Sequence, residues 1–188
     1  MKSVAFTVLA AAAVLAAGCG RKPPAPTVHA SMTEVVAPQA QTIWDITNRS
    51  FNKAGDGLDP SKISPADWIK LDAAGRQLSD RARVLAKARN VTAAAPGAEI
   101  MGDGARGAPT VQQIQAFIDA DRAGFAEHAR ILAKAGDTVA KAAKAKDVAP
   151  LFRVASGLDE VCDGCHEKYW GSDQPPQAAV AAALAARK

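Results

Sequence analysis

Apolar residues recur along most of the chain at steps of three and four, which is the spacing of one face of an α-helix. The clearest run follows Thr110, where an apolar residue returns at every seventh position: Val111, Ile118, Phe125, Leu132 and Val139. Gln113 stands three residues after Thr110, at the spacing of a capping box. We therefore predict one helix that begins after Thr110 and fades over the alanine- and lysine-rich residues 140–146.

Three further helices are predicted around this one. The first spans about residues 29–48 and contains Pro38, which predicts a kink or a late start because proline has no amide hydrogen to donate. The second is capped by Ser64 and ends near Asn90. The fourth begins after Asp147 and places six residues on one face: Leu151, Val154, Leu158, Cys162, Cys165 and Tyr169.

Glycine- and proline-containing stretches at about 50–64 and 93–108 separate these helices, and no run of residues has the alternation of a β-strand. An aromatic content of 5% also argues against a β-sandwich or barrel. With 48% hydrophobic and 22% charged residues, the chain can bury a core. We predict an all-α fold, an antiparallel and mostly up-and-down four-helix bundle over residues 31–172, followed by a flexible alanine-rich tail at 173–188.

The first residues have the pattern of an export signal. Lys2 precedes an apolar run, residues 4–17, that is too short for a comfortable membrane span and ends in small residues. The sequence Leu-Ala-Ala-Gly-Cys at 15–19 resembles the bacterial lipoprotein signal, in which the cysteine is lipidated and becomes the first mature residue. The alternative is ordinary signal cleavage nearby, which would leave Cys19 removed or free.

The lipoprotein resemblance implies a signal peptide at 1–18, lipid on Cys19 and a proline-rich tether at 19–30. The protein would then be anchored to the periplasmic side of a bacterial membrane without spanning it. Gly20, which follows the cysteine, favours the outer membrane by analogy with other lipoproteins.

The candidate chemistry lies in one pentapeptide, Cys162-Asp163-Gly164-Cys165-His166. This is the C-x-x-C-H pattern of c-type haem attachment. On a helix the two cysteines share a face, so both sulfurs can reach the two vinyl groups at one porphyrin edge, and the next residue can ligate the iron. The pattern predicts one covalently attached haem c, bound by Cys162, Cys165 and His166.

Three other uses of the same two cysteines are conceivable. A thioredoxin-like dithiol requires a βαβ context, which the sequence lacks. A zinc site requires four ligands, for which only His29 and His128 remain as partners. A disulfide inside a helix is a poor use of so close a pair. Export favours haem, because covalent haem attachment is extracytoplasmic in bacteria, and lipid plus two thioethers would account for all three cysteines.

Two segments resemble the class II c-type cytochromes, the family of cytochrome c′ and of the low-spin c556-type cytochromes. They are VCDGCHEKYW at 161–170 and MTEVVAPQAQTIW at 32–44. The resemblance covers about residues 31–170 and implies a four-helix bundle with the haem near its C-terminal helix. It makes His166 the proximal axial ligand and places Met32 on the distal side. There the low-spin members have a methionine ligand, and cytochrome c′ has an apolar residue that does not coordinate.

The predicted function is single-electron transport by a lipid-anchored monohaem cytochrome of the periplasm, with redox proteins as partners and no enzymatic activity. The alternative is a cytochrome c′-like protein whose open sixth site binds NO or CO. His29 and Met101 are further candidates for the sixth ligand, and His128 is expected at the edge of the bundle with a hydrogen bond. A haem-free exported helical protein is a third reading. The evenly spread net charge of +4 does not indicate nucleic acid, and homodimerisation stays open.

Overall fold

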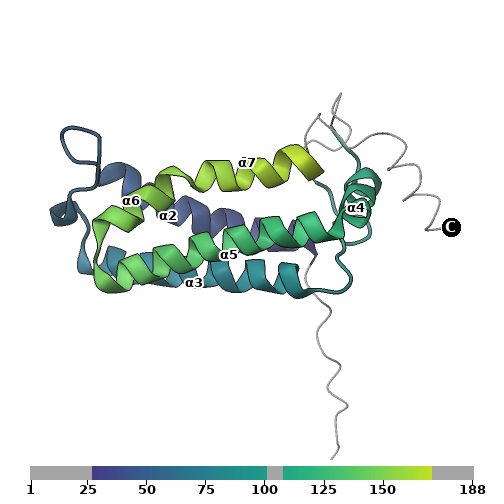
Figure 1. Ribbon diagram of the computed structural model, residues 1–188, viewed down its shortest axis with the longest axis horizontal. Coiled ribbons are helices and arrows are strands. Elements are labelled where there is room, and N and C mark those ends of the chain that lie inside the picture. The colour runs from purple at the N-terminus through teal and green to yellow at the C-terminus, as the bar shows by residue number, and fades with distance from the viewer. Residues whose placement is uncertain (1–26, 101–107, 171–188) are drawn as a thin grey trace, which may run out of the picture.

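The computed structural model describes residues 27–100 and 108–170, and all the regular elements in these ranges are helical (Figure 1). The prediction of an all-α chain is confirmed for these residues. The predicted signal peptide at 1–18, Cys19, Met101 and the predicted tail at 173–188 lie outside them. No helix in the described ranges is long and apolar enough to cross a membrane.

The first helical segment, residues 28–49, is continuous but changes its winding. It consists of α1 (Val28–Ser31), a π-helical turn (Met32–Val36) and α2 (Ala37–Arg49). The helix spans nearly the predicted residues, and of the two consequences expected from Pro38 a late start is excluded, because the helix begins at Val28, within the predicted tether. A π-turn stands just before Pro38 instead: the amide of Ala37 donates to the carbonyl of Met32, five residues back. Such turns occur mostly as local insertions, often at functional sites.

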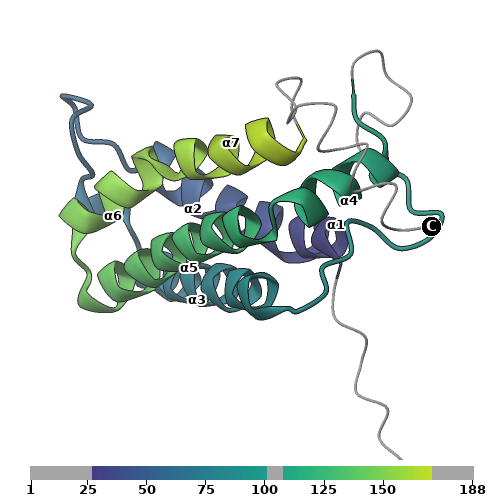
Figure 2. The same ribbon diagram turned by 45° about the vertical axis from the view of Figure 1, so that its right-hand side comes forward.

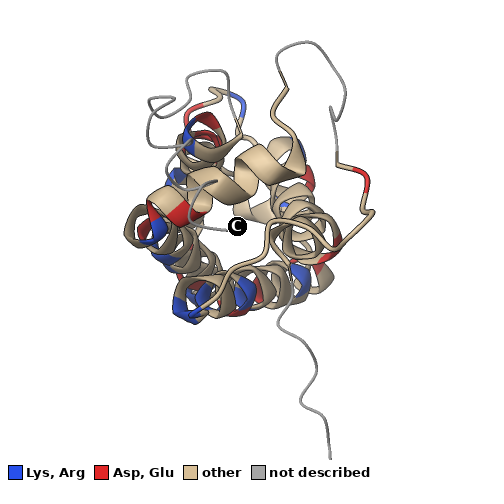
Figure 3. Cartoon of the chain, turned by 90° about the vertical axis from the view of Figure 1, so that its right-hand side faces the viewer, with Lys and Arg blue, Asp and Glu red and all other residues tan. Residues whose placement is uncertain are grey.

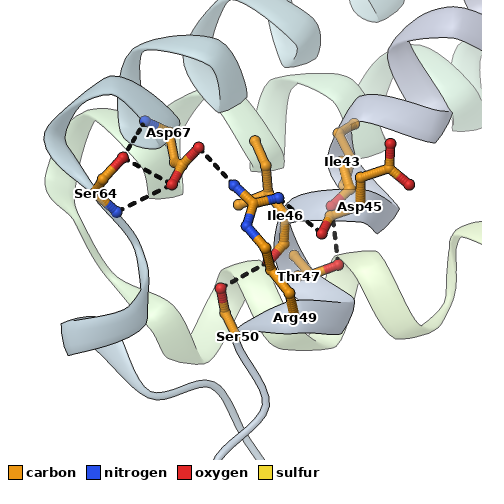
Figure 4. Close-up of polar contacts among 8 residues, drawn as sticks. All are labelled: Ile43, Asp45, Ile46, Thr47, Arg49, Ser50, Ser64 and Asp67. Carbon is orange, nitrogen blue, oxygen red and sulfur yellow. Dashed lines mark hydrogen bonds and ion pairs between the residues drawn. The ribbon is translucent and has the colours of Figure 1, made fainter.

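Helix α3 (Pro65–Lys87) begins at a capping box, as predicted for Ser64. The Ser64 hydroxyl accepts from the amide of Asp67 at 3.1 Å, and the Asp67 carboxylate accepts from the amide of Ser64 at 3.1 Å. Arg49, at the end of α2, donates to the same carboxylate at 2.6 Å (Figure 4). Asp67 therefore joins the start of α3 to the end of α2.

Replacing Asp67 by alanine is expected to cost about 1–2 kcal/mol of unfolding free energy, because it removes the carboxylate half of the capping box and the ion pair with Arg49. Hydrogen bonds from Ser64, followed by those from Arg49, hold the pKa of the Asp67 carboxyl below its usual value. A lowered folded-state pKa stabilises above the unfolded pKa, and this stabilisation is lost as the pH falls through the folded value. Urea unfolding should therefore show a difference in unfolding free energy between wild type and Asp67→Ala. This difference should be largest at pH 7 and should decrease in acid.

The matched control for this experiment is Asp72→Ala. Asp72 pairs with Arg76 one turn away on the exposed face of α3, where ion pairs contribute little. Equal losses of unfolding free energy in Asp67→Ala and Asp72→Ala would contradict the role assigned to Asp67.

The single helix predicted after Thr110 is wrong, because the structure divides it into α4 (Val111–Ala120) and α5 (Arg122–Ala145). The predicted capping box of Thr110 and Gln113 is confirmed. The break is at Asp121, which has φ −139° and ψ 65° and accepts from the amide of Gly124 at 2.9 Å. Tyr169 donates to the Asp121 carbonyl at 3.1 Å, and Lys168 pairs with its carboxylate. The break is thus held by contacts with the distant end of the chain.

The predicted fourth helix is also two helices, α6 (Val148–Ser156) and α7 (Leu158–Tyr169), which meet at Gly157. Asp147 caps α6 as predicted, accepting from the amide of Ala149 at 3.1 Å. Leu158 and Tyr169, at the two ends of α7, are buried. The face of α7 between them is therefore held against the rest of the protein.

The long helices lie side by side, with α3 and α5 in contact along most of their length and α6 and α7 following back along α5 (Figures 1 and 2). Residues of both charge signs occur around the outside (Figure 3). Four of the five predicted seven-residue-repeat positions are buried: Ile118, Phe125, Leu132 and Val139.

Small residues bring α3 and α5 unusually close. A Cβ built on Gly136 would lie 2.6 Å from the carbonyl oxygen of Gly75 and 2.7 Å from the amide nitrogen of Ser79. The Ser79 hydroxyl also donates to Asp137 at 2.7 Å. The α3–α5 contact is therefore a tight seam between two backbones, and the open space in the protein lies elsewhere.

Candidate functional site

A mainly apolar cavity of about 690 Å³ opens between the first helical segment, α5 and α7. Its volume lies in the range of about 300–1,000 Å³ that is typical of ligand and cofactor pockets. The residues that form its walls include His29, Met32, Val36, Ala40, Trp44, Leu85, Phe125, His128, Ala129, Leu132, Val161, Cys162, Cys165, His166 and Trp170.

The pentapeptide of the predicted haem site lies on one wall of this cavity. Cys162, Cys165 and His166 all belong to α7 and all line the cavity. The two cysteines are half-buried and unpaired, whereas His166 is exposed. The structure thus brings together the three residues that sequence reasoning selected, and it turns them toward a common space.

Both cysteines are thiols at neutral pH. Burial raises the pKa of Cys165 to about 11. Burial, followed by the nearby charges of Asp159 and Asp163, also raises the pKa of Cys162. Redox-active dithiols of the thioredoxin type depend on a cysteine with a lowered pKa, so this environment does not favour that use of the pair.

The opposite wall is formed by the first helical segment. His29, Met32 and Val36 line the cavity from α1 and the π-turn. Met32 is half-buried, and the π-turn starts at this residue. Two of the predicted candidates for a sixth ligand, Met32 and His29, therefore face the same cavity as Cys162 and Cys165.

A clamp fixes the beginning of this wall. The amides of Val28 and His29 donate to the carbonyls of Thr92 and Ala93 at 2.9 and 2.8 Å. Buried Gln115 of α4 holds the same loop, accepting from the amide of Ala93 at 2.8 Å. The position of His29 and Met32 thus depends on Gln115 of α4, which is more than 80 residues later in the sequence.

His128 lies in the cavity wall, not merely at an outer edge as the sequence suggested. A Cβ built on Gly164 would lie 3.7 Å from its Cε1 atom, so the ring sits over the glycine of the pentapeptide. Its centroid is 6.0 Å from that of Tyr169 in an edge-on arrangement. Because His128 stands between Phe125 and Leu132 on the α5 stripe, its helical position could have indicated this role.

Aromatic packing secures the end of α7 that carries the pentapeptide. The ring of Tyr169 meets that of Phe125 edge-on at 5.5 Å, and its hydroxyl donates to Asp121. Burial and the Asp121 charge raise the pKa of the Tyr169 phenol, which is therefore a neutral donor at physiological pH. The neighbouring Trp170 lines the large cavity, whereas Tyr169 is not part of its lining.

A smaller cavity of about 260 Å³ adjoins the large one. Gln41, Trp44 and Asp159 line both. The indole Nε1 of Trp44 is buried and has no hydrogen-bond partner among the residues that the structure describes. The sequence pattern gives no indication of this second cavity.

The donor set fits a covalently attached haem. Two protonated thiols three residues apart, an adjacent imidazole and a methionine on the opposite wall surround a mainly apolar volume. Within the described ranges, no group of three or more His, Cys, Asp and Glu side chains is arranged to hold a bare metal ion. No family model, curated protein or solved structure matches this chain.

Proposed function

We propose that this protein is a monohaem c-type cytochrome with a four-helix-bundle fold, which carries single electrons on the periplasmic side of a bacterial membrane. The observation that supports this most directly is the gathering of Cys162, Cys165 and His166 on one wall of the 690 Å³ cavity. When bound, the haem supplies an iron that alternates between the ferric and ferrous states.

Residues on two walls of the cavity would hold the cofactor. Cys162 and Cys165 would hold the cofactor by thioethers, and His166 would be the axial ligand from the same helix. Met32 would approach from the π-turn on the opposite wall. Buried apolar side chains such as Phe125 and Leu132 limit the access of water, which reduces solvent reorganisation around a change of charge.

The four-helix arrangement is proposed with the first helical segment, α3, α5 and the pair α6–α7 as its four members. The helical winding changes locally at the π-turn and at Gly157. The first helical segment and the pair α6–α7 each still count as one member of the bundle. Lipid on Cys19 would tether this body to the membrane, and redox proteins of the same compartment would be its partners.

Covalent haem staining tests the proposal. The full-length chain would be exported in a bacterial host that carries a c-type cytochrome maturation system, and the product separated on a denaturing gel. We expect a band at the mass of the chain that retains haem. An unstained band, beside a control cytochrome that stains, would refute haem attachment and leave a haem-free helical protein.

The visible spectrum of the ferrous protein, with and without carbon monoxide, then separates the two haem functions. A low-spin spectrum that the gas does not change means that both axial positions are filled, as electron transfer favours. A high-spin spectrum that shifts with the gas would instead assign the protein to the gas-binding, cytochrome c′-like function, with Met32 as part of an apolar wall.

Replacing Met32 by alanine is expected to convert the haem fully from low spin to high spin and to make it bind carbon monoxide. The reason is that the substitution removes the thioether of a residue that lines the same cavity as the pentapeptide. The absorption spectrum of the ferrous protein measures the change. His29→Ala is the matched control, since His29 lines the same wall and its loss should leave the spectrum low-spin. The reverse pattern would make His29 the ligand.

A further inference from the structure

Helices α3 and α5 carry more positive charge than the other described helices. Together they contain ten Lys or Arg residues and five Asp or Glu residues, whereas α7 contains one Lys and four Asp or Glu residues. Lys and Arg segments gather along the lower side of the bundle, where α3 and α5 lie (Figures 1 and 3). The bundle is therefore polarised, with its positive charge concentrated away from the helix that carries the pentapeptide.

The outer sides of α3 and α5 are joined into one surface by the ion pair of Arg83 with Asp137, whose side chains are both partly exposed. Arginines match the carboxylates along this surface, since Arg76 pairs with Asp72, Arg83 also with Asp80, and Arg130 with Glu127. The lysines of α3 and α5 form no ion pair within the described ranges. We define the basic face as the following residues of this surface: Arg76, Arg83, Lys87, Arg130, Lys134, Lys141 and Lys144.

Large apolar side chains are exposed beside these cations. Ile69, Val84 and Ile131 have exposed fractions of 71%, 45% and 43%, and all three belong to α3 or α5. Val84 stands three residues before Lys87, and Ile131 three residues before Lys134, which is the spacing of neighbours on a helix surface. Cations interspersed with exposed aliphatic groups are typical of surfaces that lie on a membrane, where anionic headgroups meet the cations and the apolar groups enter the lipid.

The proposed lipid site is within reach of this face. The amide of Val28, the first helical residue, donates to the carbonyl of Thr92 at 2.9 Å, and Val28 shares a buried cluster with Leu85 near the end of α3. Cys19 stands nine residues before Val28, a distance that even an extended chain spans with only about 30 Å. A lipid on Cys19 would thus hold a bilayer close to the end of α3, which favours lipid over an acidic protein as the partner.

We propose that the basic face docks on an anionic phospholipid surface. The tether in this argument rests on the proposed function, whereas the charges and the exposed apolar residues of the face do not. Because α7 lies on the far side of the bundle from α3 (Figures 1 and 2), docking would turn the pentapeptide away from the lipid. The proposed haem site would then remain open to redox partners that approach from the aqueous side.

Lysine acetylation in the presence of vesicles tests the proposal. The protein is purified after export and mixed with vesicles of phosphatidylcholine, either alone or with phosphatidylglycerol, and mass spectrometry measures the acetylation rate of each lysine. We expect Lys134, Lys141 and Lys144 to react about tenfold more slowly on the anionic vesicles, an effect that high salt should remove. The exposed Lys53 should react equally fast on both. The measurement requires neither haem nor lipid on Cys19, so it can fail independently of the proposed function.

Two double variants with the same change of charge locate the contact. Lys134→Gln with Lys141→Gln removes two charges of the basic face, and Lys144 should then lose most of its protection by anionic vesicles. Lys53→Gln with Arg153→Gln removes two exposed charges outside α3 and α5, and Lys144 should keep its protection. Equal acetylation of the basic face on both kinds of vesicle, equal protection of Lys53, or the same response in the two double variants would overturn the proposal.

Discussion

Replacing Cys162 and Cys165 together by serine is expected to abolish covalent haem attachment completely. Both sulfurs lie on the α7 face that lines the large cavity, and serine cannot form a thioether. The cysteines are only half-buried, and serine is smaller, so the helical content of the protein should remain. Haem staining of a denaturing gel and far-ultraviolet circular dichroism measure the two properties separately.

Cys19→Ser is the control for this experiment. It also removes a cysteine, but from the predicted lipid site, which lies outside the described residues. We expect this variant to keep its haem and to lose only its membrane attachment. A double variant that still stains, or a Cys19→Ser variant that loses the stain, would contradict the assignment of Cys162 and Cys165.

Replacing Gly136 by alanine is expected to destabilise the protein by about 3 kcal/mol, although the same change in an isolated helix would stabilise it by about 1 kcal/mol. The reason is the seam between α3 and α5. The new Cβ would lie 2.6 Å from the Gly75 oxygen and 2.7 Å from the Ser79 nitrogen, and neither backbone can rotate away as a side chain could. Thermal unfolding should show a midpoint lower by about 10 °C.

Gly157→Ala provides the comparison. A Cβ at Gly157 would lie 3.5 Å from the Arg153 oxygen, which is an ordinary contact, and its φ of −100° is open to any residue. We expect a change within about 1 kcal/mol. If Gly136→Ala proved as stable as Gly157→Ala, the close approach of α3 and α5 would be refuted.

The same seam contrasts with the large cavity that the protein keeps between other helices. Glycine and serine let α3 and α5 approach closely, whereas larger residues, among them Met32, Trp44 and Phe125, stand around the large cavity. Sequence reasoning identified the apolar stripes of these helices. It did not show which helix faces would pack directly against each other and which would border a cavity.

The helix breaks were missed for a related reason. The repeat after Thr110 continues through Asp121 without interruption, so the local pattern indicates one helix. Asp121 leaves the helical conformation where its backbone and carboxylate meet Tyr169 and Lys168, residues nearly 50 positions away. A contact between residues so far apart in the sequence cannot be recognised from the local pattern of apolar residues.

The role of His128 was likewise underestimated. It lies at the edge of an apolar stripe, where the sequence pattern allows either a surface or an interior position. The packing of α7 decided between them, because Gly164 lies against the His128 ring.

By itself, the sequence determined the all-α class, the caps at Ser64, Thr110 and Asp147, and the face of α7 that carries Cys162 and Cys165. These features depend on hydrogen bonds and spacings within a few residues, which a linear sequence displays directly. Only the tertiary structure decided the breaks, the α3–α5 seam, the two cavities and the wall that opposes His166. Those features depend on which side chains of different helices come into contact. The short-range periodicity of the sequence does not contain that information.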